Sequence, residues 1–267
     1  MKNKRLIAIL GILFFIVFIV VLSSTVFTLV HAEVVFSQVL DSENTNFGTD
    51  NERQAVIQSA NFDFGKCIFF IDKQAHIDYL EKANPYLEVL NIETIFPNKF
   101  IIHALEREEL YSIRLSETSF AIMDKSLKVL DINAVSRGVS VLMPDITEVI
   151  SAELGQTLNI GSEHINMLCS VYSALSKIGA TETEIGYSVA DIIGTFSKIQ
   201  LDTALNTITL ETFVGTDIII KNPNNDLLTK MLQAMSAFEN SPEVYDTITV
   251  EDIIDVNNPS YYIFYAD

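Results

Sequence analysis

The first 32 residues hold only three formal charges, and all of them lie within residues 1–5, at Lys2, Lys4 and Arg5. An unbroken apolar run follows, and no charge returns until Glu33. A helix needs about 20 uncharged, mostly apolar residues to cross the hydrocarbon layer of a membrane. We therefore expect a transmembrane helix over residues 6–27. Residues 1–5 are expected to form a cytoplasmic tail, because basic residues favour the cytoplasmic side, and the rest of the chain is expected outside.

A cleaved signal peptide is the alternative. Val30 and Ala32 are small residues at the spacing that signal peptidase requires, which would place the cut after Ala32. Against this, the apolar run exceeds the roughly 7 to 15 residues of a signal peptide's apolar segment. Ser23 to His31 would also make an overlong gap before the cut. An uncleaved anchor is therefore favoured.

The chain beyond the predicted membrane helix is strongly acidic. Three of the 17 Lys and Arg lie in residues 1–5, which leaves 14 against 35 Asp and Glu and a formal charge of −21. Nucleic acids and anionic lipid surfaces both attract a basic patch. Neither partner is therefore expected, and the acidic surface most simply favours solubility.

Residues 30–108 have the pattern of a small α+β domain. The predicted elements are a strand over Val34–Leu40, a helix from about Asp50, a helix from Asp72 to Ala83, and a hairpin over Ile92–Glu108. The hairpin turns at Pro97 and Asn98, which are typical turn residues. Alternation predicts that one face of the hairpin packs under the two helices. The inward residues would be Leu90, Ile92, Thr94, Phe96, Phe100, Ile102 and Ala104.

Residues 109–267 predict a second, mixed β-rich domain with helices. Its expected elements are strands within Leu110–Glu117 and Ser119–Ile132, a helix from Ser162 that Gly179 ends, a hairpin around Gly215, a helix over Asn225–Glu239, and two closing strands. The inner face of the helix after Ser162 is expected to include Ile165, Leu168, Cys169, Tyr172, Leu175 and Ile178.

The sequence contains no convincing active site. The histidines are dispersed and never pair with a Cys or Asp at the spacing of metal ligands; they are His31, His76, His103 and His164. No glycine-rich phosphate loop occurs. We therefore expect no enzyme activity, no cofactor and no metal. Cys67 and Cys169 are expected to be buried free thiols, and a disulfide outside the cell is the alternative.

The string NPYLEVLNIETIFPNKFIIHALERE, residues 84–108, resembles the end of the POTRA domain in bacterial cell-division proteins of the DivIB/FtsQ type. The shared features are an apolar strand, a proline turn, an alternating strand and a closing Glu-Arg pair, here Glu106 and Arg107. Residues 65–87, 119–132 and 207–235 also resemble that family, whereas residues 146–194 do not match. Glu109 stands where the family usually has a proline.

The resemblance implies an α+β fold: a single N-terminal transmembrane helix, a POTRA-like strand-helix-helix-strand-strand domain over 30–108, and the β domain over 109–267. It implies a non-catalytic, membrane-anchored scaffold of the division machinery. Such a scaffold acts at the division septum, binds DivIC/FtsB-like and FtsL-like single-pass division proteins, and helps to control septal cell-wall synthesis. The alternative is an extracytoplasmic ligand-binding protein or hydrolase, secreted or anchored, that is unrelated to division.

The C-terminal stretch PSYYIFYAD predicts a strand with apolar or aromatic residues on both faces. One interpretation is a strand that the β domain covers on both sides. The other is a partner site, where another chain adds a strand to the sheet. In the family that the chain resembles, the partner site lies in this part of the β domain, which favours the second interpretation. The predicted partner-binding residues are Tyr261, Tyr262, Ile263, Phe264 and Tyr265.

Overall fold

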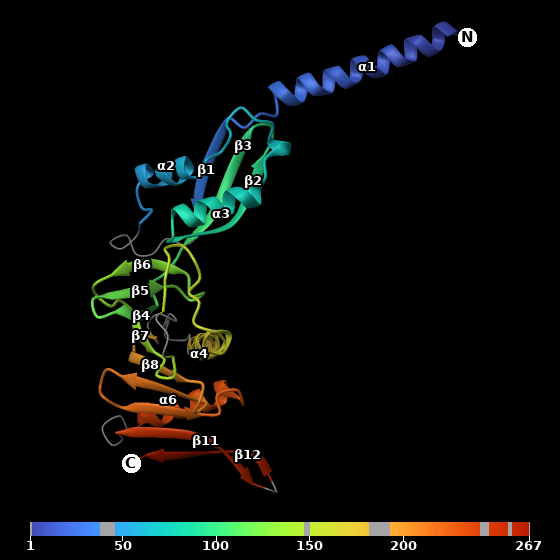
Figure 1. Cartoon of the computed structure of the whole chain (residues 1–267). Helices are drawn as coiled ribbons and strands as arrows, with labels where there is room; N and C mark the ends of the chain where they lie inside the picture. Colours follow the sequence, from blue (N-terminus) through green and yellow to red (C-terminus); the bar gives the residue numbers. More distant parts are fainter. Residues whose placement is uncertain are drawn as a thin grey trace. The chain divides into compact units, whose positions relative to one another are not determined.

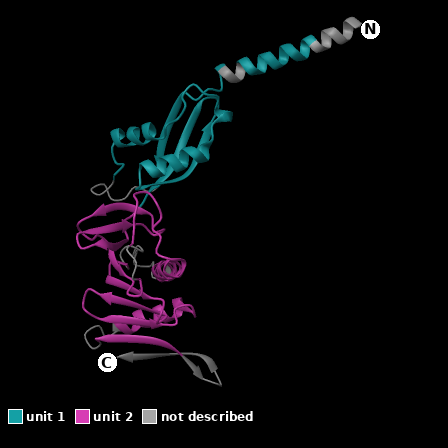
Figure 2. Ribbon diagram, viewed as in Figure 1, with its two compact units in different colours: residues 1–107 teal, residues 108–267 magenta. Residues whose placement is uncertain are grey.

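The computed structural model describes residues 2–37, 46–146, 150–181, 193–240, 246–255 and 258–266. Side chains are described at these positions except 2–9, 22–24, 180–181, 240, 253–255 and 258–266. The chain forms two compact units, Met1–Arg107 and Glu108–Asp267 (Figure 2). Each unit combines helices with a sheet around its own hydrophobic core, so the α+β part of the expected fold class is correct.

The N-terminal helix α1 runs from Lys2 to Thr25 (Figure 1). Its large apolar side chains between Leu10 and Val21 are 48% to 73% exposed. Among the described residues, no helix is long and apolar enough to cross a membrane. The transmembrane helix predicted over 6–27 is therefore contradicted, and only its helical conformation is correct.

Unit 1 has the expected order strand, helix, helix, strand, strand. Its elements are β1 (His31–Phe36), α2 (Asp50–Ser59), the short 3-10 helix η1 (Ile68–Phe70), α3 (Lys73–Ala83), β2 (Leu87–Ile95) and β3 (Lys99–Glu106). The sheet order is β1-β3-β2, with β1 parallel and β2 antiparallel to β3. β1 and β2 are thus the two edge strands of this sheet.

Local capping fixes where the two helices of unit 1 begin. Thr49 and Glu52 form a capping box at the start of α2, in which each side chain accepts a hydrogen bond from the other residue's backbone N–H. The Asp72 side chain accepts hydrogen bonds from the N–H groups of Gln74 and Ala75 at the start of α3. The predicted start at Asp72 is therefore confirmed, as is the end of α3 at Ala83.

The β2–β3 hairpin confirms most of the predicted inward face. Phe100, Ile102 and Ala104 are fully buried, and Ile92 is 5% exposed. The prediction for Leu90 is wrong, because the β2–β3 register shifts between Val89 and Asn91 and the side chain of Leu90 is 49% exposed. Phe96 is also wrong: it lies in the turn beyond β2 and is 59% exposed.

The segment just before β1 is part of the fold of unit 1. The N–H of Leu29 donates to the carbonyl of Lys66 at 2.9 Å, and the carbonyl of Leu29 accepts from the N–H of Gly65 at 2.8 Å. The Leu29 side chain is fully buried in the core of unit 1. Residues before a cut at Ala32 therefore contribute both backbone pairing and core packing to unit 1.

Unit 2 contains a nine-stranded sheet in the order β12-β11-β10-β9-β8-β7-β4-β5-β6. The strands are β4 (Tyr111–Ser116), β5 (Ser119–Met123), β6 (Val129–Asn133), β7 (Val139–Leu142), β8 (Phe196–Asp202), β9 (Thr207–Thr212), β10 (Asp217–Lys221), β11 (Thr247–Asp255) and β12 (Asn258–Ala266). The pairs β4/β7, β7/β8 and β10/β11 are parallel, and the others are antiparallel.

Two helices, α4 (Ser162–Thr181) and α6 (Leu227–Asn240), share one core with this sheet. The predicted stop at Gly179 is wrong, because α4 continues to Thr181. The prediction that Cys169 lies on the inward face of this helix is also wrong, because Cys169 is exposed. Val171, which was not predicted to face inward, is fully buried. Both cysteines are free thiols, and neither is buried, since Cys67 is only half-buried.

Candidate functional site

The predicted partner-binding residues lie in β12, which forms one edge of the sheet in unit 2. β11 and β12 run side by side at that edge (Figure 1). The backbone register places Tyr261 opposite Ile253, Tyr262 opposite Asp252, Ile263 opposite Glu251, Phe264 opposite Val250 and Tyr265 opposite Thr249. The side chains of Tyr261 to Tyr265 lie outside the described residues, so their predicted burial or exposure stays a prediction. No described strand pairs with the outer edge of β12.

The β11–β12 hairpin extends beyond the strand that supports it. β10 pairs with β11 from Asp217 opposite Thr247 to Ile220 opposite Val250, and β10 ends one residue later at Lys221. β11 continues to Asp255. In the described part of the chain, the last residues of β11 therefore pair with β12 alone. A two-stranded hairpin is only marginally stable by itself, so its attachment at the end of β10 determines how firmly it is held.

Two ion pairs join this part of β11 to the rest of unit 2. On one side, Lys221 Nζ lies 2.6 Å from Glu251 Oε2, and both side chains are partly exposed. On the other, Lys230 Nζ lies 3.0 Å from Asp252 Oδ2. The Lys230 side chain is fully buried, and its ammonium also donates to the carbonyls of Lys221 at 2.8 Å and Asn222 at 2.9 Å.

Sequence reasoning did not single out Lys230 or Asp252, although both positions carried a signal. On β11 the buried residues alternate as Ile248 and Val250, so the next residue on that face is Asp252. On α6 the buried residues are Leu227, Met231 and Ala234, and Lys230 falls on the same helical face. A charge on each of two buried faces is the pattern of a buried ion pair.

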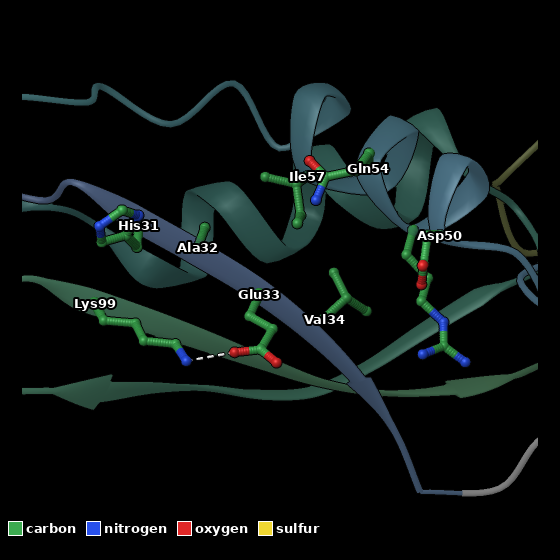
Figure 3. A pocket seen from close by; sticks show the side chains of 9 residues that line it. His31, Ala32, Glu33, Val34, Asp50, Gln54, Ile57 and Lys99 are labelled. Atoms are coloured by element: carbon green, nitrogen blue, oxygen red, sulfur yellow. Dashed lines mark hydrogen bonds and ion pairs between the residues drawn. The ribbon is translucent and has the colours of Figure 1, made fainter.

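A pocket of about 550 Å³ in unit 1 is a second candidate (Figure 3). It is lined by His31, Ala32, Glu33 and Val34 of β1, by Asp50, Arg53, Gln54 and Ile57 of α2, and by Lys99. Glu33 and Lys99 form an ion pair across the β1–β3 ladder. The hydrogen bond and the charge of Lys99 lower the pKa of Glu33. Arg53 donates from Nε to the Phe47 carbonyl at 3.2 Å.

One edge of β1 borders this pocket. The N–H groups of His31 and Ser37 donate toward β3, to the carbonyls of Asn98 at 3.3 Å and Ala104 at 3.0 Å. Because strand residues alternate, Ala32 and Val34 direct their backbone groups to the opposite edge, where no described strand pairs. The pocket therefore places charged side chains beside a strand edge with which no described strand pairs, a combination suited to a polar ligand or an extended peptide.

The Glu-Arg pair at the end of β3 has a structural role within unit 1. The Glu106 carboxylate is buried and accepts a hydrogen bond from Asn46 Nδ2 at 2.9 Å. Arg107 reaches Glu81 of α3 at 3.2 Å and donates from Nε to the Leu87 carbonyl at 3.1 Å. Arg107 thus ties α3 and β2 to the end of β3, while Glu106 holds the segment before α2 at Asn46.

The most enzyme-like group lies in unit 2 and lacks the order of a catalytic triad. His164 Nε2 lies 2.9 Å from Asp145 Oδ1, and the other carboxylate oxygen of Asp145 accepts from the N–H of Thr203 at 3.1 Å and from the Thr203 hydroxyl. Burial alone would raise the pKa of Asp145, but these hydrogen bonds outweigh it and lower the pKa to about 2. A triad needs the imidazole between the hydroxyl and the carboxylate, whereas here the carboxylate lies between the other two.

The other histidines are dispersed, as the sequence indicates. His76 Nδ1 lies 2.9 Å from the Ala60 carbonyl, and His103 Nε2 lies 2.9 Å from Glu93. Within the described ranges, no three His, Cys, Asp or Glu side chains are placed to hold a metal ion.

No protein-family model matches this sequence, and a search of the curated proteins finds no match.

Proposed function

We propose that the protein is a non-catalytic scaffold of the bacterial division machinery. It acts at the division septum on the outer side of the cytoplasmic membrane, binds DivIC/FtsB-like and FtsL-like division proteins, and helps to control septal cell-wall synthesis. The resemblance of residues 84–108 to the DivIB/FtsQ type supports this proposal. So does the strand-helix-helix-strand-strand order of unit 1 followed by a β-rich unit.

The observation that carries the proposal is the outer edge of β12, with which no described strand pairs. Edge strands usually carry charges or proline that prevent another strand from adding. Tyr261 to Tyr265 contain neither, although Pro259 lies at the start of the strand. A partner segment that adds to this edge gains backbone hydrogen bonds, and aromatic side chains on the strand supply selectivity.

The experiment is a titration of the purified protein with the ectodomain of the DivIC/FtsB-like protein from the same bacterium. Tyr262→Ala and Phe264→Ala are each expected to cost about 2 kcal/mol or more of binding free energy. Tyr79→Ala is the matched control, because Tyr79 is an exposed aromatic residue of unit 1. Each variant must keep the melting temperature of the wild type. Unchanged affinity in folded variants at all five positions of the predicted site would contradict the proposal.

A second candidate function is ligand binding by unit 1, and one observation favours it: the pocket between β1 and α2. A fragment or short-peptide ligand there should perturb the NMR signals of Gln54 and Ala32, and Arg53→Ala should weaken its binding. The two functions separate cleanly in this test. Arg53→Ala leaves the affinity for the division partner unchanged if that partner binds only β12.

A further inference from the structure

We propose that Lys230 and Asp252 form a buried latch that holds the β11–β12 hairpin in the position where a partner can use the edge of β12. The inference rests on the proposed function, because it concerns how that partner site is presented. Lys230 is thus a positioning residue: its ammonium contacts the carbonyls of Lys221 and Asn222 at the end of β10 and the Asp252 carboxylate on β11.

The latch lies where support from β10 ends. Lys221 is the last residue of β10, and the chain turns away at Asn222, whose φ is +49°. The carbonyls of these two residues accept hydrogen bonds from the Lys230 ammonium. The third acceptor of the ammonium is Asp252 on β11. The buried Lys230 ammonium therefore binds the last carbonyls at the end of β10. It also holds β11 at Asp252, just beyond Val250, where the pairing with β10 ends.

The burial of Lys230 makes this contact obligatory for the folded state. An ammonium with a fully buried side chain needs acceptors for its protons and an opposing charge, because leaving water is costly for an ion. Here three oxygens within 3.0 Å supply both. If β11 moved away, the ammonium would lose its contact with the Asp252 carboxylate. Detachment of the hairpin at Asp252 would therefore break an ion pair whose lysine side chain is fully buried, which is costly.

The ion pair between Lys221 and Glu251, on the opposite face of β11, is more exposed than the Lys230–Asp252 pair and is therefore expected to be weaker. The Lys221 and Glu251 side chains are 47% and 28% exposed, so water and salt screen their attraction. They provide a matched control: the same kind of ion pair, one residue along β11, without burial. The latch hypothesis predicts that removing this pair has little effect on the hairpin.

The contact between Lys230 and Asp252 also affects partner binding, because it changes the fraction of molecules in which the hairpin is docked. A partner that adds to β12 binds only the fraction of molecules in which the hairpin is docked, and its apparent Kd rises as that fraction falls. Lys230→Met keeps the length and apolar stem of the side chain but removes the charge. We expect this change to weaken binding of the DivIC/FtsB-like ectodomain at least tenfold. Lys221→Met should change the affinity less than twofold.

The decisive variant replaces the ion pair between Lys230 and Asp252 with an apolar contact. Well-packed apolar residues often replace a buried ion pair without loss of stability. The double change Lys230→Met with Asp252→Val places an apolar pair at the same contact and continues the face formed by Ile248 and Val250. We expect the double variant to recover the affinity to within about threefold of the wild type, while Asp252→Val alone resembles Lys230→Met.

Hydrogen exchange supplies the readout that a general loss of stability would not produce. In Lys230→Met, amides of β12 should exchange faster while those of β8 and β9 remain protected. Wild-type affinity and exchange in Lys230→Met would overturn the latch. So would a double variant that regains protection in β12 but not affinity. If the wild type itself fails to bind the ectodomain, the proposed function fails, and the exchange comparison still decides whether Lys230 holds the hairpin.

Discussion

The ring of Phe100 on β3 lies edge-on to the ring of Phe62, with the ring centroids 5.6 Å apart. Phe62 precedes α3, so this contact joins the hairpin to the helical layer of unit 1. Phe100 and the next inward residue, Ile102, are both fully buried. The inner face of the β2–β3 hairpin is therefore the part of unit 1 on which the helices pack.

Truncation of this face should destabilise unit 1 strongly. Phe100→Ala and Ile102→Ala are each expected to lower the free energy of unfolding by about 2 to 5 kcal/mol, because each leaves a cavity in the core. Lys99→Ala, which removes only a partly exposed ion pair with Glu33, should cost at most about 1 kcal/mol. Urea titration of each variant, with hydrogen exchange of the β3 amides as the readout, measures the three changes in the free energy of unfolding. Equal, small effects at all three positions would contradict the observed register.

The segment before β1 gives a second prediction, on processing. Leu29 is fully buried, whereas its neighbour Val30 is 49% exposed. Leu29→Ala should cost about 2 to 5 kcal/mol and Val30→Ala less than about 1 kcal/mol. A chain that begins at Glu33 should show a weakened unit 1, since it lacks Leu29 and the first two residues of β1. If that shortened chain melts like the full chain, the segment contributes nothing to the fold, and cleavage after Ala32 becomes compatible with it.

The hydroxyl of Tyr111 gives a third prediction. It is buried and has no hydrogen-bond partner among the described residues. Burial, with smaller contributions from Tyr172 and Cys169, raises the pKa of Tyr111 above its ordinary value of 10. Tyr111→Phe removes the unsatisfied group and keeps the ring, so it should leave stability unchanged or raise it by up to about 1 to 2 kcal/mol.

The sign of the pH effect at Tyr111 follows from the raised pKa. The folded state keeps the proton above pH 10, where the unfolded state loses it, so wild-type stability falls as the pH rises through and above 10. Tyr111→Phe should show a smaller fall over the same range. Thermal melts at pH 8 and at about pH 10.5 compare the two proteins. A Tyr111→Phe variant that is less stable than the wild type at pH 8 would indicate that the hydroxyl has a partner.

Local signals in unit 1 were sufficient to predict the order of its helices and strands, although β1 is His31–Phe36 and begins before the strand expected over Val34–Leu40, whose residues 38–40 lie outside the described residues. Asp72 caps a helix, Pro97 marks a turn, and Phe100, Ile102 and Ala104 alternate toward one core. The bulge after Val89 has no comparable signal, since neither Leu90 nor Asn91 is a glycine or proline. Its effect was to turn Leu90 outward, because one extra residue in a strand reverses the faces of its neighbours.

The arrangement of unit 2 could not be predicted in the same way. The hairpins β5–β6 and β9–β10 join neighbours in sequence, so turn residues such as Gly215 identify them. The parallel pairs β4/β7, β7/β8 and β10/β11 join strands separated by long connections, and no local pattern specifies which strands meet. The aromatic composition of Tyr261 to Tyr265 predicted a strand, but its place at the sheet edge depends on that long-range order.

Asp145 gives the last prediction, a dependence of stability on acid. Its carboxylate joins the loop after β7 to His164 at the start of α4 and to Thr203 at the end of β8. Asp145→Asn removes the charge from these hydrogen bonds. We expect a cost of about 1.5 to 3 kcal/mol at pH 7, as for hydrogen bonds to charged groups. Thr203→Val, which removes only the hydroxyl and keeps the backbone N–H, should cost less.

The pH range follows from the lowered pKa of Asp145, which is about 2 in the folded state against an ordinary value of 3.8. The folded state holds the carboxylate charged where the unfolded state is already protonated, so the stabilisation is complete above about pH 4 to 5 and is lost as the pH falls through 3.8 toward 2. The difference in stability between wild type and Asp145→Asn should therefore be constant from pH 5 to pH 7 and shrink below pH 4. Urea titrations at pH 7, 5, 4 and 3 measure it. A difference that stays constant down to pH 3 would show that the charge of Asp145 does not stabilise the fold.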